Sequence, residues 1–206
     1  MAEPAIKAIE TSYAGCHFRS RLEARWAVFF DALKIPWQYE AQGYVVGGRP
    51  YLPDFDLPNP DDGKSYLVEV KGSADRLDAS LIAATALELD RAVLVLGPMP
   101  KQAVRPIPDF DRLARRADKE SGYVHWTCYP DRGEVFWRET FWLAFRMTSD
   151  PDRPYWLPYP IGWDITKAPS ADRILGQSTW RVNTPQSVWS AYRAGSTARF
   201  EHGETP

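Results

Sequence analysis

The stretches YLPDF (residues 51–55) and LVEVKG (residues 67–72) decide the fold expected of this chain. On a strand, alternate side chains share one face, so Glu69 and Lys71 point the same way, about 6.6 Å apart along the chain. Val68 and Val70 point to the opposite face. A carboxylate and an amine at the end of an apolar strand are costly to bury without compensation. A divalent metal ion or a phosphate is the natural compensation.

A second carboxylate is expected beside this pair. Asp54 precedes Glu69 by fifteen residues, and a turn cluster rich in Pro, Asn and Asp fills residues 58–63 between them. This spacing fits two adjacent antiparallel strands whose ends meet, which brings both carboxylates to one metal ion. Asp56 lies on the same face of its strand as Asp54, and we interpret it as a solvated acid at the strand end.

Helix and strand patterns alternate through the N-terminal part. A helix is predicted over residues 17–33, because Pro36 ends it and apolar residues recur at helical spacing. Its buried face consists of Leu22, Trp26, Phe29, Phe30 and Leu33. The other predicted elements are a strand at 37–40 that continues across a bend into 43–46, strands at 51–57 and 65–70, helices at 75–89 and 110–120, a fully buried strand at 91–97, and a hairpin of 123–128 with 134–137. This order predicts an α/β fold with a mixed central β-sheet flanked by helices.

Composition changes after residue 148. Residues 150–170 are rich in proline and aromatics, which predicts an extended arm laid over the surface. A final helix is expected over residues 185–200, with Thr184 as its N-cap and Pro185 as its first residue. We therefore divide the chain into a core domain at 1–148 and a C-terminal arm and helix at 149–206.

The overall composition excludes several classes of protein. The chain has 206 residues, of which 44% are hydrophobic and 25% charged, so wholesale disorder is excluded. No run approaches about 20 apolar residues, so no membrane span is expected. Two cysteines and no visible signal segment predict a cytoplasmic location. The net charge of −2 argues mildly against a non-specific nucleic-acid coat protein, but a cluster of acidic metal ligands would also lower the net charge.

The order Pro53-Asp54, turn cluster, then Glu69-Val70-Lys71 resembles the PD-(D/E)XK nuclease superfamily. The resemblance covers residues 18–97 and implies a restriction-endonuclease-like core. It also implies an acidic residue on the preceding helix, and Glu23 lies at that position. The stretch FRSRLEARW at 18–26 is similar to phage and actinobacterial nuclease-like proteins of this superfamily. On a helical wheel, Glu23 falls beside Phe30 at the edge of the buried face.

The resemblance implies metal-assisted hydrolysis of phosphodiester bonds, with DNA as the expected substrate. Glu23, Asp54 and Glu69 would hold one or two Mg²⁺ ions, for which Mn²⁺ would substitute, and the Val70 carbonyl would be a further ligand. A water acidified by the metal would be the nucleophile, and Lys71 would orient it and neutralise developing charge. The protein would act in the bacterial cytoplasm, or in the host cytoplasm if phage-encoded, as a monomer, a homodimer or part of a larger complex.

Two further sets of cations are candidates for nucleic-acid contact. Arg19 lies about one turn before Glu23, where it either contacts the scissile phosphate, holds a ligand carboxylate or extends to solvent. A second set falls on one helical stripe, which suits either a phosphate backbone or a solvated face. It consists of Arg112, Arg115, Arg116 and Lys119.

The sequence also allows three other interpretations of its function. Zinc binding by Cys16, His17, His125 and Cys128 lacks the usual paired spacing. The late aromatics either stack on single-stranded bases or fill the core. The chain is alternatively a non-catalytic, nuclease-like subunit that binds DNA or assembles a recombination, transposition or defence complex. The presence of all four candidate catalytic residues favours the enzyme.

Overall fold

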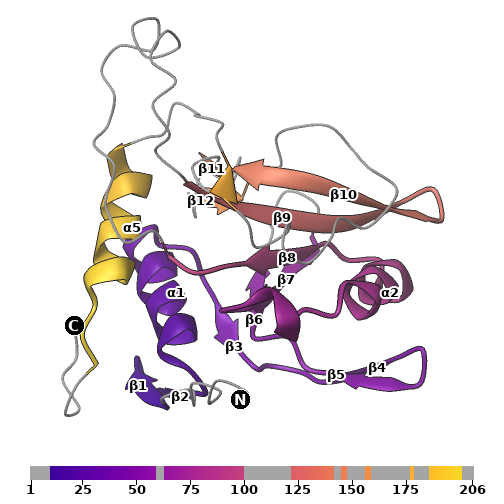
Figure 1. The fold of residues 1–206 in the computed structure, drawn as a ribbon, viewed down its shortest axis with the longest axis horizontal. Helices are drawn as coiled ribbons and strands as arrows, with labels where there is room; N and C mark the ends of the chain where they lie inside the picture. The colour runs from indigo at the N-terminus through magenta and orange to yellow at the C-terminus, as the bar shows by residue number, and fades with distance from the viewer. Residues whose placement is uncertain are drawn as a thin grey trace, which may run out of the picture.

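A mixed β-sheet organises the computed structural model, which describes residues 10–58, 63–99, 122–141, 145–147, 156–158, 177–178 and 186–200. Six strands follow the order β10-β9-β8-β7-β6-β3, and β13 pairs with β9 off this path (Figure 1). The strands are β3 (Gln38–Tyr39), β6 (Phe55–Pro58), β7 (Ser65–Val70), β8 (Val93–Leu96), β9 (Gly122–Asp131), β10 (Glu134–Phe141) and β13 (Gln177–Ser178). Three small antiparallel pairs are β1 (Thr11–Tyr13) with β2 (Cys16–Phe18), β4 (Tyr44–Val46) with β5 (Arg49–Tyr51), and β11 (Phe145–Met147) with β12 (Trp156–Pro158).

The sheet is mixed because β7 and β8 run parallel, whereas the other pairings are antiparallel. A parallel pair needs a crossover connection, and helix α2 supplies it. The helices of the described residues are α1 (Arg21–Ala32), the 3-10 turn η1 (Ala74–Arg76), α2 (Ala79–Leu89) and α5 (Gln186–Thr197). The predicted α/β class with a mixed central sheet flanked by helices is confirmed.

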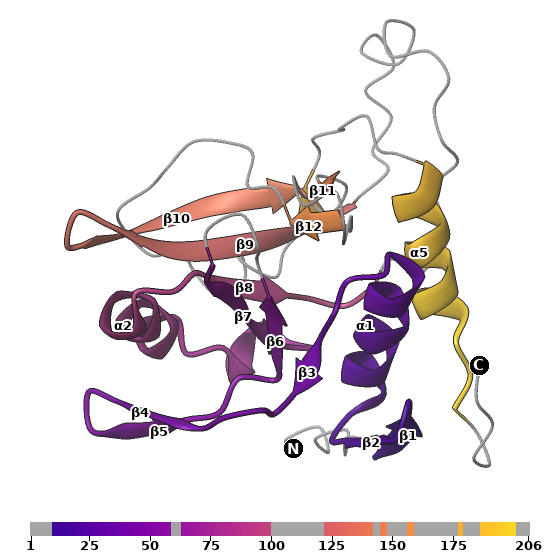
Figure 2. The ribbon, with the colours of Figure 1, turned by 180° about the vertical axis from the view of Figure 1, so that it is seen from behind.

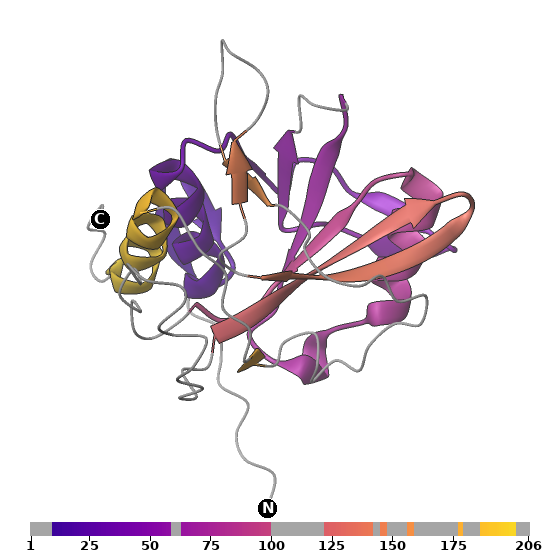
Figure 3. The same cartoon turned by 90° about the horizontal axis from the view of Figure 1, so that it is seen from above.

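The sheet separates two apolar cores, with α1 and α5 on one face and α2 on the other (Figure 3). Side chains alternate between these faces along each strand. The α1-side core combines Trp26, Phe29, Phe30, Phe55, Val68, Val70, Leu94 and Leu96 with their neighbours. The α2-side core combines Leu67, Ile82, Val93, Val95, Trp126, Cys128 and Trp137. All four residues of β8 are buried, as predicted for the apolar run at 91–97.

Helix α1 begins four residues later than predicted. Cys16–Phe18 forms strand β2 with β1, and Ser20 then caps the helix by accepting from the Glu23 N–H at 3.3 Å. Ser20 and Glu23 have the spacing of a capping box, which favours a helix start at this point. The predicted buried face is otherwise correct, although Leu22 is only half-buried.

Residues 43–57 differ from their prediction in two ways. Residues 44–51 form a separate hairpin, β4–β5, which turns at Gly47 and Gly48 with positive φ at both and lies beside α2 (Figure 2). The predicted strand at 51–57 is divided between β5 and β6, with Pro53 in the gap between them. Proline lacks a backbone N–H and breaks the ladder.

The helix predicted at 75–89 is divided into η1 and α2. Asp78 lies between them and caps α2 by accepting from the Leu81 N–H at 2.9 Å. The late hairpin is confirmed and longer than predicted, with Trp137 opposite Cys128.

Helix α5 packs on α1 and belongs to the same core. The ring of Tyr192 lies 4.4 Å from Phe29 and 5.9 Å from Trp26 between centroids. The predicted cap of α5 at Thr184 and Pro185, the helix at 110–120 and most of the arm at 150–170 lie outside the described residues. No helix in the described ranges is long and apolar enough to cross a membrane.

Candidate functional site

The candidate site forms where β6 begins and β7 ends. The two strands are antiparallel, with Phe55 opposite Val68. The N–H of Asp54 donates to the Val68 carbonyl at 2.9 Å, and the N–H of Val70 donates to Asp54 Oδ2 at 2.7 Å. Asp54 and Glu69 therefore meet at adjacent strand ends, as their spacing predicted.

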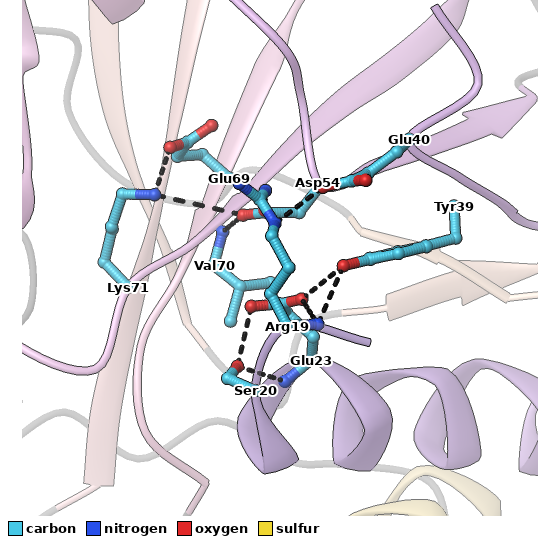
Figure 4. A network of polar contacts seen from close by, with 9 residues as sticks. All are labelled: Arg19, Ser20, Glu23, Tyr39, Glu40, Asp54, Glu69, Val70 and Lys71. Carbon is cyan, nitrogen blue, oxygen red and sulfur yellow. Dashed lines mark hydrogen bonds and ion pairs between the residues drawn. The ribbon is translucent and has the colours of Figure 1, made fainter. Parts of the chain in front are cut away.

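Lys71 closes the site beyond the end of β7 (Figure 4). Its Nζ forms an ion pair with Glu69 Oε1 and lies 4.0 Å from Asp54 Oδ2. Lys71 is 22% exposed at its side chain, whereas Asp54 is 3% exposed, so the ammonium sits between the buried carboxylates and solvent.

The other Glu69 oxygen, Oε2, is buried and makes no hydrogen bond of normal geometry with the described residues. The hydroxyl of Tyr51 is also buried without a hydrogen bond of normal geometry in this part of the chain. Burial, then the charge of the nearby Glu69 carboxylate and a hydrogen-bonding contact with it, raise the pKa of Tyr51, so its phenol stays protonated. A buried, unsatisfied carboxylate oxygen is costly unless a further donor or a cation completes the site.

The raised pKa of Asp54 also indicates that positive charge would stabilise its ionised form. Burial, and after it the Glu69 carboxylate, raise the pKa of Asp54 to about 7, and Glu23 adds a smaller effect in the same direction. Lys71 and the Val70 N–H oppose the rise without cancelling it. Carboxylates that crowd together in a buried position favour protonation until a cation neutralises them.

Glu23 is buried at the N-terminus of α1, on the side of the site away from Lys71 (Figure 4). Its Oε1 accepts from the Ser20 hydroxyl at 2.6 Å. Its Oε2 accepts from the Tyr39 hydroxyl at 2.7 Å and from the Arg19 N–H at 3.1 Å. Glu23 is close enough to influence Asp54 electrostatically, but both of its oxygens already have donors.

Arg19 bridges two carboxylates at the rim of the site. Its Nη2 lies 2.8 Å from Asp54 Oδ1, and its Nε lies 2.6 Å from Glu40 Oε1. Of the alternatives open from the sequence, the structure shows Arg19 holding the carboxylate of Asp54.

Three residues of the site were not predicted from the sequence: Tyr39, Glu40 and Tyr51. Tyr39 ends the short edge strand β3, and Glu40 follows it with a left-handed φ of 45°. Its N–H donates to the Asp54 carbonyl at 3.1 Å. Tyr39 and Glu40 were expected at the end of a strand at 37–40, but the groups that they contact are distant in sequence.

Other sequence-based interpretations have clear outcomes. Asp56 is not a solvated acid, because it pairs with Arg91 at 2.6 Å. Cys16 packs against the α1-side core and Cys128 lies in the α2-side core, so the sheet separates them and the zinc alternative is wrong. Trp126 and Trp137 are buried core residues and not a stacking platform. The stripe of Arg112, Arg115, Arg116 and Lys119 lies outside the described residues, as does the side chain of His125.

The residues present suit a hard divalent cation. In the described part of the chain, no three His, Cys, Asp or Glu side chains are arranged to hold a metal ion. Lys71 instead pairs with Glu69, and Arg19 pairs with Asp54. Carboxylate oxygens, among them the buried Glu69 Oε2, are the ligand type that Mg²⁺ and Mn²⁺ prefer.

Comparison of the chain with protein-family models, with curated proteins and with solved structures found no match.

Proposed function

We propose that this protein is a metal-dependent nuclease with a restriction-endonuclease-like core that hydrolyses phosphodiester bonds, with DNA as the favoured substrate. The observation that carries the proposal is the Glu69 carboxylate, which is buried with one oxygen on Lys71 and, among the described residues, no hydrogen bond of normal geometry at the other. It lies beside a second buried carboxylate, Asp54, whose pKa is raised to about 7. Two such acids next to one lysine form a site for a cation and a phosphate together.

Asp54 and Glu69 would hold Mg²⁺ or Mn²⁺, with the Val70 carbonyl as a third oxygen ligand. A bound divalent ion would lower the pKa of a coordinated water and neutralise charge on the phosphate. Glu23 would contribute through a bridging water, because both of its oxygens already accept hydrogen bonds from protein groups.

Lys71 would act on the phosphate and not on the metal. Its ammonium is partly exposed and lies within 4.0 Å of Asp54, at the mouth of the site. Once a cation replaces it as the partner of Glu69, it is free to neutralise charge that develops on the phosphate oxygens. This role needs an ammonium group held close to the carboxylates, and Lys71 meets this need because it directly follows the end of β7.

A non-catalytic binding or assembly subunit is the weaker explanation. Such a subunit gains nothing from two adjacent buried acids, because their mutual repulsion and desolvation destabilise the fold. A surface of lysines and arginines would bind DNA without that cost. The buried position of Asp54 and Glu69 is therefore better explained by a cation-dependent reaction.

The test combines metal binding with cleavage. Glu69→Gln keeps the size of the side chain and removes its charge, so calorimetry should show Mn²⁺ affinity lowered at least about tenfold and cleavage abolished. Glu88→Gln is the matched control, because Glu88 is exposed on α2, where it accepts from the Gly47 N–H. Labelled linear, circular and single-stranded DNA and RNA would identify the substrate. Undiminished Mn²⁺ affinity in Glu69→Gln would contradict the assignment.

A further inference from the structure

Arg19 combines an exposed side chain with a fixed backbone. The side chain is 59% exposed, yet Nη2 contacts the buried Asp54 at 2.8 Å and Nε contacts Glu40 at 2.6 Å. The Arg19 N–H, in contrast, donates to both Glu23 and Tyr39 at 3.1 Å (Figure 4). The guanidinium can therefore leave Asp54 by side-chain rotation alone, without movement of α1 or β3.

We propose that Arg19 is a metal-displaced phosphate-binding residue: it neutralises Asp54 while the site holds no metal, and a cation bound at Asp54 releases its guanidinium to a nucleic-acid phosphate. Glu40 keeps the released side chain at the rim of the site. This inference rests on the proposed function, because it assumes a divalent cation at Asp54.

Metal binding and phosphate binding would be coupled because the metal ion and the Arg19 guanidinium compete for one oxygen of Asp54. Arg19 uses Asp54 Oδ1, whereas Oδ2 accepts from the Val70 N–H. Oδ1 is therefore the Asp54 oxygen that a metal ion would take. A divalent ion at that oxygen repels the guanidinium and binds the carboxylate more strongly than a partly exposed ion pair does.

Glu40 is suited to retain the arginine. Its backbone is held by the N–H bond to the Asp54 carbonyl and has a left-handed φ of 45°, which a non-glycine residue adopts only where its surroundings enforce it. Glu40 contacts Nε, so both Nη atoms become available to a phosphate once Nη2 has left Asp54. That fork matches two phosphate oxygens at once, which an ammonium cannot do.

The first measurement is Mn²⁺ affinity by calorimetry for wild type, Arg19→Ala and Arg21→Ala. Removing the competing guanidinium should tighten Mn²⁺ binding by about fivefold, the change that corresponds to an ion pair of about 1 kcal/mol. Arg21→Ala removes the same charge two residues away, where Nε has no hydrogen-bond partner among the described residues, and should change the affinity less than about twofold. Unchanged or weaker binding in Arg19→Ala would refute the competition.

The second measurement is binding of a short fluorescein-labelled DNA duplex, by anisotropy, in EDTA and in Ca²⁺, which takes the same oxygen ligands. Wild type should gain affinity in Ca²⁺, whereas Arg19→Ala should lose most of that gain despite its tighter metal binding. Glu40→Gln, which removes the retaining charge, should fall between them. An equal gain in Arg19→Ala would overturn the phosphate role. Wild type that binds no Mn²⁺ would instead refute the proposed function itself.

Discussion

Asp54→Asn should make the metal-free protein more stable at alkaline pH, although it removes a residue of the candidate site. In the fold, burial and then the Glu69 carboxylate raise the pKa of Asp54 to about 7. In the unfolded chain the same group ionises near about 4. The folded protein thus holds the proton more tightly. The resulting stabilisation is complete below about pH 4 and is lost as the pH rises through about 7.

The size of the effect follows from the separation of the two pKa values. Each pH unit between them removes about 1.4 kcal/mol, to a total on the order of 4 kcal/mol. The amide of the variant does not ionise, but it has one acceptor oxygen for the Val70 N–H and Arg19 in place of two. That loss costs about 1–3 kcal/mol at every pH. The unfolding free energy of the variant minus that of wild type should therefore rise by about 1.4 kcal/mol per unit up to about pH 7 and then level off.

Urea denaturation followed by tryptophan fluorescence, in EDTA from about pH 5 to about pH 8, measures this difference. Asp78→Asn is the matched control. Hydrogen bonds from Ser80, then Arg49 and the Leu81 N–H, lower the pKa of Asp78, so it is ionised in both folded and unfolded chains above about pH 5. Its variant should differ from wild type by a constant. Mn²⁺ at about 100 times its Kd should stabilise wild type by about 2.7 kcal/mol and leave Asp54→Asn unchanged. A pH-independent difference for Asp54→Asn would refute the reasoning.

Lys71→Ala should lower single-turnover cleavage by about 100-fold or more with Mn²⁺ affinity retained or increased, because an ammonium opposes a bound cation; activity near wild type excludes the role. Glu23→Gln should slow cleavage strongly while circular dichroism shows α1 intact, and an unchanged rate removes Glu23 from the site. Gly195→Ala should lower the free energy of unfolding by about 1–3 kcal/mol in urea. Its Cβ would lie 2.6 Å from the Arg25 carbonyl oxygen and 2.7 Å from Met99 Sδ; undiminished stability would show that α5 can move away from α1 at no cost.

Local patterns in the sequence were sufficient for the class of fold and for the strand-end part of the site. The alternation in residues 65–70 places Glu69 and Lys71 on one face, and the turn cluster after Pro58 makes the neighbouring strand antiparallel, so Asp54 had to meet Glu69. The start of α1 was misplaced even though the Ser20–Glu23 capping box was present. Helical spacing of apolar residues does not by itself mark where a helix begins.

Only the tertiary structure determined which partners complete the site. Arg19, Tyr39 and Glu40 reach Asp54 and Glu23 because strand β3 pairs with β6 at the sheet edge, beside the start of α1. Periodicity in a sequence specifies the face on which a side chain lies. It does not specify the distant group that the side chain meets, because that contact depends on how separate elements pack. The charge balance at Asp54 is a sum over such contacts, and so it was decided by the fold and not by the motif.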